Sequence, residues 1–347
     1  MSPSLSDVFE EFVIYMSAET SKINVKNYQY RLKTFLDKYG RRPIGLLSPK
    51  HADQWRLSLI TERQLAPKSV YGYTQCLQKL DRFIVDRYPD AYRPIAAHIK
   101  NKQPKPRIGK KLPNIDDVMT LKETAVALIA DPPDLQYLRD AVIVLWLIET
   151  GCRRSEVSAL ETRLMGLNQP YVEVVNGVGV NVYEARLPHA KTDSDWDEEQ
   201  TVDYLEPLAA ALRKWLEYRP PTDRNGKRYH HLFVGVGDCG RHRKKENTLT
   251  CWVCRHYGMP MTSSAIRFAL ANIVDRAGVS HISPHQLRHA FGQRALDTSN
   301  AEIARQRLRH KDIRVTTMFY GHQDKGRRRR GAVVGSLLID LEGSQEP

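Results

Sequence analysis

The stretch TGCRRSEVSAL, residues 150–160, follows the longest apolar run of the chain and decides how its second half folds. The run before it, AVIVLWLI at residues 141–148, indicates a buried helix. Gly151 is a residue type that ends helices, because glycine adopts a left-handed backbone without steric penalty. Arg153 and Glu156 follow three positions apart, so they are expected to point the same way on the next helix.

Two later segments combine a helix start with chemically active side chains. In SPHQLRHAF, residues 283–291, a serine can cap a helix, a proline suits its first turn, and His285 and Arg288 share one face. In LRHKDIRVTTMFYGH, residues 308–322, His310 precedes a helix that bears Tyr320. Taken singly these signals are weak, because an arginine and a glutamate three apart are commonly a surface ion pair, and a helical histidine is commonly a packing residue.

The spacing of apolar residues along the rest of the chain predicts the other elements. Apolar positions three and four apart recur in residues 5–100, which indicates a small helical bundle. Residues 171–204 change to short runs of β-branched and aromatic residues separated by glycines, which indicates a small antiparallel sheet. Helical spacing occurs at residues 115–129, 207–218, 262–277, 284–296 and 301–308. The predicted fold class is mainly α with a small antiparallel β-sheet.

A change of composition marks the expected domain boundary. The chain has 347 residues, more than one core usually organises, since domains commonly have ~100 to 200 residues. The stretch IKNKQPKPRIGKKLP, residues 99–113, alternates prolines with basic residues. We place an N-terminal domain at 1–103, a basic linker at 104–112 and a second domain at 113–347. A cationic extended linker suits a strap across a phosphate backbone, and equally an ordinary solvated connection.

The charge of the chain indicates the kind of partner it has. Lysine and arginine number 53 against 40 aspartates and glutamates, so the formal charge is +13. Basic residues recur in loops and between segments, as in nucleic-acid-binding proteins, although a merely basic soluble protein is the other interpretation. No run approaches the ~20 apolar residues of a membrane helix, and the start lacks the pattern of a signal peptide. With an odd number of cysteines, five, we expect a soluble cytoplasmic protein with reduced thiols.

The three segments together resemble the tyrosine recombinase (phage integrase) family. That family has an arginine in a TGxRxxE segment, an HxxR segment, a later histidine, and a tyrosine in TTxxYxH, and each piece occurs here in the same order. The preceding helices resemble the family's core-binding domain. The resemblance implies a helical, SAM-like core-binding bundle followed by a tyrosine-recombinase catalytic domain, which cleaves and rejoins DNA through a 3′-phosphotyrosine at Tyr320, without a cofactor.

The chemistry of that reaction explains these residue types. Attack by a phenol on a phosphodiester builds negative charge on the non-bridging oxygens, and Arg153 and Arg288 can each present parallel N–H donors to them. The phenol of Tyr320 has a reference pKa of ~10 and needs a base or cationic surroundings. The resemblance implies that His285 and His310 hydrogen-bond the phosphate or assist proton movement. The alternative is neutral histidines that pack a helix end.

Lys191 is the candidate general acid. In the family a lysine in a β-hairpin protonates the departing 5′ hydroxyl, an effect worth ~10²- to 10⁴-fold. The segment LPHAKTDSDWDEEQTV, residues 187–202, resembles that hairpin loosely, is unusually acidic, and lacks the arginine that often follows. The alternative is a solvated loop lysine.

Arg309 departs from the family pattern, because a glycine usually precedes the histidine matched to His310. A long cation here either contacts phosphate or distorts the turn, and the sequence leaves both open. Glu156 is expected to orient Arg153 or the neighbouring backbone, and not to act as a catalytic base.

An insertion that the family does not generally carry, DCGRHRKKENTLTCWVCRH at residues 238–256, pairs Cys239 with His242 and Cys251 with Cys254. Tetrahedral zinc takes such ligand pairs, and a basic loop held by zinc would contact DNA or a partner. The alternative is a flexible loop with uncoordinated thiols, so no metal is assigned.

The resemblance also implies partners. These are double-stranded DNA sites, a homotetramer on two synapsed sites with a dimer on each, accessory DNA-bending or directionality proteins, and an association with the nucleoid. The apolar segment AVVGSLLIDL, residues 332–341, either docks on a neighbouring protomer or folds back on its own domain. Two other functions are a catalytically silent DNA-binding architectural or regulatory protein, and a type IB topoisomerase or telomere resolvase.

Overall fold

The computed structural model describes residues 2–101, 112–175, 178–188, 200–237, 256–298 and 300–309. The chain divides into two compact units, Met1–Arg107 and Ile108–Pro347. Each unit has its own hydrophobic core. The units are therefore described separately.

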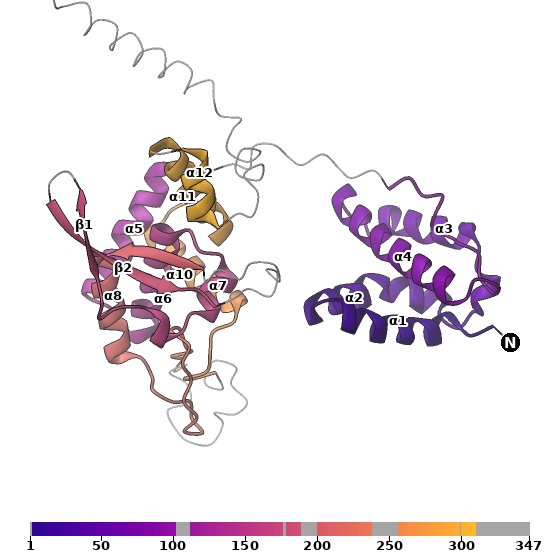
Figure 1. Cartoon of the computed structure of the whole chain (residues 1–347), viewed down its shortest axis with the longest axis horizontal. Helices are drawn as coiled ribbons and strands as arrows, with labels where there is room; N and C mark the ends of the chain where they lie inside the picture. The colour runs from indigo at the N-terminus through magenta and orange to yellow at the C-terminus, as the bar shows by residue number, and fades with distance from the viewer. Residues whose placement is uncertain are drawn as a thin grey trace, which may run out of the picture. The chain divides into compact units, whose positions relative to one another are not determined.

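The N-terminal unit is the predicted helical bundle (Figure 1). Serines and prolines mark the helix starts: Ser4 and Ser21 accept hydrogen bonds from backbone N–H groups of the first turns, and prolines open the third and fourth helices. Aromatic residues on the inner faces, including Phe12, Phe35 and Trp55, are fully buried. The helices are α1 (Leu5–Glu19), α2 (Lys22–Tyr39), α3 (Pro49–Thr61) and α4 (Pro67–Arg87), with a 3-10 turn, η1, at Ile44–Leu46.

A buried carboxylate fixes the chain that follows α4. Asp81 accepts hydrogen bonds from the Tyr92 hydroxyl at 2.6 Å, the Ile95 backbone N–H at 2.9 Å and the Ala96 backbone N–H at 3.0 Å. Farther along, the Asn101 side chain donates to the Tyr71 carbonyl at 3.1 Å. The segment that approaches the predicted linker is thus held against α4.

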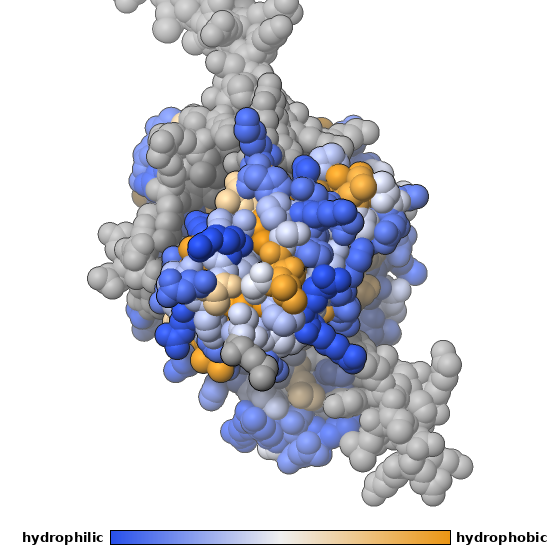
Figure 2. All heavy atoms as spheres, turned by 90° about the vertical axis from the view of Figure 1, so that its right-hand side faces the viewer, coloured by the Kyte–Doolittle hydropathy of each residue, from blue (hydrophilic) through white to orange (hydrophobic). Residues whose placement is uncertain are grey.

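The surface of this unit is mainly polar on the face that Figure 2 shows. Figure 2 shows one of its faces, where hydrophilic residues cover most of the area and hydrophobic residues form smaller patches between them. Small exposed apolar patches of this kind are normal on protein surfaces. No helix among the described residues of either unit has the length and apolarity to cross a membrane.

The second unit is built around α6 (Leu135–Thr150), whose residues 138–148 are all buried. Helices α5, α8, α10 and α11 pack against it, and α12 packs on α11. This central position explains why residues 141–148 of α6 are apolar on every face. The other helices are α5 (Ile115–Ala130), α7 (Arg154–Ala159), α8 (Glu206–Tyr218), α10 (Ser263–Ala277), α11 (Pro284–Thr298) and α12 (Ala301–Leu308), with a 3-10 turn, η2, at Thr162–Leu164.

The predicted sheet has three antiparallel strands in the order β1-β2-β3: β1 (Tyr171–Val175), β2 (Val178–Arg186) and β3 (Thr201–Leu205). Tyr183 pairs with Tyr204 across β2 and β3, and the two rings stack beside α6, where Trp146 contacts Tyr204. The fold class predicted from the sequence, mainly helical with a small antiparallel sheet, is confirmed.

Candidate active site

The site begins where α6 ends. Gly151 has a left-handed backbone, with φ of 59°, and ends the helix as predicted. A side chain here would collide with α11, because a Cβ atom on Gly151 would lie 2.7 Å from Cγ of Phe291. The glycine thus turns the chain sharply while α11 packs close to the turn.

Arg153 and Glu156 meet at the start of α7. Arg153 is the N-cap residue, so it precedes the helix instead of lying on it. One carboxylate oxygen of Glu156 accepts the Arg153 backbone N–H at 2.7 Å, and the other accepts from Nη1 of the guanidinium at 2.6 Å. Glu156 therefore orients both the side chain and the backbone of Arg153, the two alternatives that the sequence left open.

Arg288 joins two helix ends from a buried position on α11. Its Nη1 donates to the Gly151 carbonyl at 2.7 Å, and its Nη2 donates to the Leu308 carbonyl at the end of α12. These are carbonyls that a helix end leaves without an intrahelical partner. Ser283 caps α11, because its hydroxyl accepts the Gln286 backbone N–H at 3.3 Å. The sequence predicted the Ser283 cap and the position of Arg288 on this helix. The burial of Arg288 depends on long-range packing.

Arg309 points into the protein. It ends α12 with a left-handed backbone, φ 54°, and its side chain is 5% exposed. Its Nη2 lies 2.9 Å from a carboxylate oxygen of Glu156 and 3.5 Å from Sγ of Cys152. The carbonyl of Arg309 accepts a hydrogen bond from Nη2 of Arg153 at 3.5 Å. The helix ends in a left-handed turn at Arg309, and its guanidinium is a buried partner of Glu156 that sequence reasoning missed.

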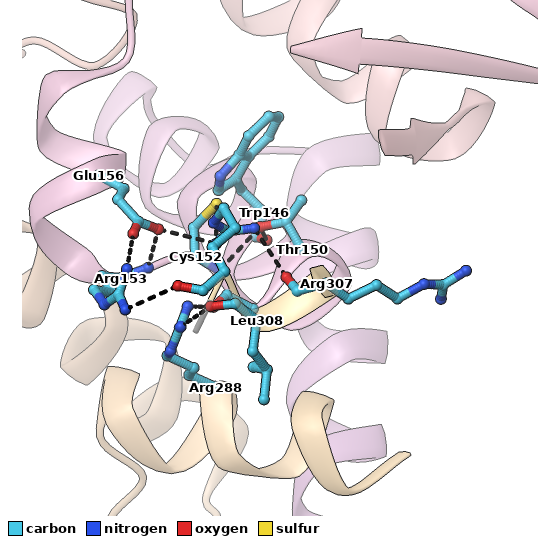
Figure 3. A network of polar contacts seen from close by, with 10 residues as sticks. Trp146, Thr150, Cys152, Arg153, Glu156, Arg288, Arg307 and Leu308 are labelled. Carbon is cyan, nitrogen blue, oxygen red and sulfur yellow. Dashed lines mark hydrogen bonds and ion pairs between the residues drawn. The ribbon is translucent and has the colours of Figure 1, made fainter. Parts of the chain in front are cut away.

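Figure 3 shows how these groups converge: Glu156 faces Arg153, and Arg288 reaches the backbone of Leu308 from the neighbouring helix. The departure from glycine at residue 309 was the sequence signal that could have identified the third arginine. Nothing local to it indicates an inward direction, because the acceptor Glu156 lies far away in the sequence.

The electrostatics follow from burial and proximity. Burial by itself raises the pKa of the Glu156 carboxyl, but Arg309, Arg288 and Arg153 outweigh it and hold that pKa below its ordinary value. Burial, followed by repulsion from Arg153 and Arg309, lowers the pKa of Arg288 to about 10. Arg288 remains charged at neutral pH. Within this network the three guanidinium groups exceed the single carboxylate, so the site favours an added anion.

His285 lies on the first turn of α11 and is exposed, whereas His289, one turn later, is buried. Their Nε2 atoms are 2.9 Å apart and the rings meet edge to face. One of the two rings must carry a hydrogen on Nε2, because a hydrogen bond needs a donor and an acceptor. The pairing of the two histidines was not predicted.

Three of the predicted site residues, Lys191, His310 and Tyr320, lie outside the described residues. The same holds for residues 238–255 of the insertion, which include Cys239, His242, Cys251 and Cys254, and for the apolar segment 332–341. In the part of the chain that is described, no group of three or more metal-binding side chains is close enough to hold an ion.

Comparison with known proteins places this geometry in a family. Residues 118–327 match the model of the phage integrase family, and these residues cover most of the second unit. The fold and the match identify a DNA strand-exchange enzyme family, the tyrosine recombinases. The chain belongs to the phage integrase family.

Relatives match over nearly the whole chain. Tyrosine recombinase XerA of Pyrococcus furiosus is 24% identical over 344 residues, which are 98% of this chain and 98% of that protein. Tyrosine recombinase XerC of Treponema denticola is 22% identical and matches 92% of this chain and 94% of that protein.

Solved structures share the fold. The Tn1549 transposon integrase in complex with transposon right end DNA has a TM-score of 0.62 at 19% identity, covering 96% of this chain and 100% of that one. The XerH site-specific recombinase bound to its palindromic difH substrate has a TM-score of 0.61 at 16% identity, covering 94% of this chain and 84% of that one.

Proposed function

We propose that the chain is a site-specific DNA recombinase that works through a 3′-phosphotyrosine on Tyr320. The observation that carries the proposal is the convergence of Arg153 and Arg288. These arginines come from distant segments, and they donate to the carbonyls of the adjacent residues Arg309 and Leu308. Two guanidinium groups anchored at one helix end provide charge-assisted donors for one phosphate.

In the proposed reaction the Tyr320 oxygen attacks the scissile phosphorus, and the bond from phosphorus to the 5′ oxygen breaks. The phenol proton passes to a base as the ester forms, with His285 and His310 as the candidates, and the departing 5′ oxygen receives a proton from Lys191. A 5′ hydroxyl from the partner strand then attacks the phosphotyrosine, which releases the tyrosine and rejoins DNA. The ester conserves the bond energy, so no ATP is required.

The arginines stabilise the negative charge that develops on the non-bridging oxygens in both steps. Arg288 is suited to this role because its position is fixed by two carbonyls before DNA binds. The exposed His285 adds a hydrogen-bonding group on the same helix. His310, the residue after Arg309, is proposed to hydrogen-bond the phosphate or to assist proton movement.

The partner we propose is double-stranded DNA, bound by a core-binding domain at residues 1–103, a basic linker at 104–112 and the catalytic domain at 113–347. The DNA complexes of the integrase and XerH relatives support this partner. A net charge of +13 favours such binding. We further propose a tetramer on two synapsed sites, with integration, excision or resolution of a mobile element as its task, assisted by accessory proteins.

A covalent-trapping experiment tests the proposal. Nicked duplexes tiled across the DNA that flanks the gene at its native locus let the fragment beyond the cleavage point diffuse away, which traps the ester. The native chain should form a covalent adduct that survives denaturing electrophoresis, and Tyr320→Phe should form none. Tyr218→Phe, a change on the exposed Tyr218 of α8, is the matched control and should form as much adduct as the native chain.

Other results would overturn the proposal. Binding of these duplexes without any adduct would indicate a catalytically silent DNA-binding protein. Adduct formation together with plasmid relaxation, but without recombination between two copies of the cleaved site, would indicate a topoisomerase.

A further inference from the structure

Arg309 and Arg153 are connected in a closed ring. Starting at Arg153, Nη1 contacts one oxygen of Glu156 at 2.6 Å, and the other oxygen contacts Nη2 of Arg309 at 2.9 Å. The carbonyl of the same Arg309 then returns to Nη2 of Arg153 at 3.5 Å. Arg309 thus contacts Nη2 of Arg153 directly through its carbonyl. Through its side chain it also holds Glu156, which fixes Nη1 of Arg153.

The position of Arg309 is unfavourable by local criteria. A non-glycine residue with positive φ is uncommon, and Arg309 has φ 54°. Its guanidinium is also buried, and its Nε has no hydrogen-bond partner in the described part of the chain. Backbone strain and a buried, incompletely satisfied cation at the same residue indicate a site held in place for function.

The exposures separate Arg309 from Arg153. The Arg153 side chain is 39% exposed, whereas the Arg309 side chain is 5% exposed and lies against Glu156 and Cys152. Arg153 can therefore reach a phosphate from solvent. Arg309 contacts the group that orients Arg153, so its effect on the reaction is indirect.

We infer that Arg309 is a positioning residue, which sets the direction of the Arg153 guanidinium toward the scissile phosphate through the shared carboxylate of Glu156. This inference rests on the proposed recombinase function. Without the Arg309 side chain, one oxygen of Glu156 keeps only the Arg153 backbone N–H as a partner, and the ring that fixes the Arg153 guanidinium opens. The side chain of Arg153 then loses alignment in the transition state, while its charge and its reach to DNA are retained.

The experiment measures the single-turnover cleavage rate at saturating duplex, together with the equilibrium affinity for the same duplex at several salt concentrations. Arg309→Gly removes the side chain and suits the left-handed backbone, so it isolates the guanidinium. Arg309→Lys retains a charge near Glu156. Arg294→Gln, a change on the exposed Arg294 of α11, is the matched control for loss of one positive charge.

We expect Arg309→Gly to cleave about 10- to 100-fold more slowly at saturation, with unchanged affinity and unchanged salt dependence. Arg309→Lys should recover part of the rate, and Arg294→Gln should cleave like the native chain. Because Arg309 acts through Glu156, the double variant Arg309→Gly with Glu156→Gln should be no slower than Glu156→Gln alone. If Arg309→Gly fails to fold, the cleavage rates of Arg309→Lys and of its double variant with Glu156→Gln test the inference in its place.

The inference would be overturned by native cleavage rates in Arg309→Gly. It would also be overturned if Arg309→Gly bound DNA more weakly and the slope of log affinity against log salt became about one unit shallower. That result would identify a direct contact between Arg309 and a phosphate. Multiplicative effects in the double variant would contradict action through Glu156. Failure of the native chain itself to form an adduct would instead refute the proposed function, and no variant is needed to see it.

Discussion

Glu156 holds Arg153 at two points, because its carboxylate accepts both the backbone N–H at 2.7 Å and the guanidinium Nη1 at 2.6 Å. The carboxylate is 2% exposed, so these contacts are made in a desolvated environment. A single acidic side chain thus fixes the start of α7 and the side chain of Arg153. Neutralising it leaves buried guanidinium groups without their counter-charge.

Replacement of Glu156 by glutamine is expected to destabilise the protein and to slow DNA cleavage. Removing one partner from a buried ion pair costs ~3–5 kcal/mol, because the remaining charge stays desolvated. Calorimetric unfolding measures the first effect, and adduct formation on nicked duplexes measures the second. The control is Glu149→Gln, which removes the more exposed pair with Lys122 and should cost below about 1 kcal/mol. Equal losses in the two variants would contradict a special role for the Glu156 network.

The stabilisation by Glu156 should depend on pH in a definite direction. The folded protein holds the pKa of this carboxyl below its ordinary value of 4.5, so the unfolded chain takes up a proton more readily. The contribution is therefore complete above about pH 4.5 and is lost as the pH falls through the lower folded pKa. The difference in free energy of unfolding between the native chain and Glu156→Gln should shrink over that range. A difference that stays constant or grows on acidification would refute the assignment.

The sequence was sufficient for the local features of the fold. Apolar spacing located α6 and the three strands, and Gly151 ends α6 where expected. Arg153 and Glu156 could be paired because they are three residues apart. These features depend on neighbours in sequence, which pattern analysis can read.

The remaining features depend on contacts between distant segments. Arg288 has an ordinary helical setting in sequence, and its burial follows from the carbonyls of Gly151 and Leu308. Arg309 turns inward only because Glu156 lies beside the end of α12. Asp81 is likewise a common helix residue until residues 92–96 fold over it. Sequence spacing contains no signal for such partners.

Asp81→Asn should loosen the segment that follows α4. The asparagine retains one acceptor oxygen but presents an NH₂ group to buried donors that now reach a carboxylate, such as the backbone N–H of Ile95. An unsatisfied buried donor costs ~1–3 kcal/mol. Limited proteolysis should therefore cut residues 90–101 faster in this variant. The control is Asp86→Asn at an exposed position of α4, and cleavage at the same rate in both variants would show that the carboxylate does not hold the segment.

Gly151→Ala should disturb both the fold and the anchor of Arg288. At φ 59° an alanine suffers the left-handed backbone penalty of ~1–2 kcal/mol, and its Cβ would lie 2.7 Å from Cγ of Phe291. Because the Gly151 carbonyl accepts from Arg288, any shift of this turn also displaces that guanidinium. We expect a lower unfolding temperature and slower adduct formation.

Gly226→Ala is the control for the cost of the left-handed backbone alone, since Gly226 has φ 78° with nothing within 4 Å of a Cβ. It should leave the cleavage rate unchanged. Combining Gly151→Ala with Phe291→Ala should relieve the collision, so a double variant as slow as Gly151→Ala alone would locate the defect in the backbone instead of the ring.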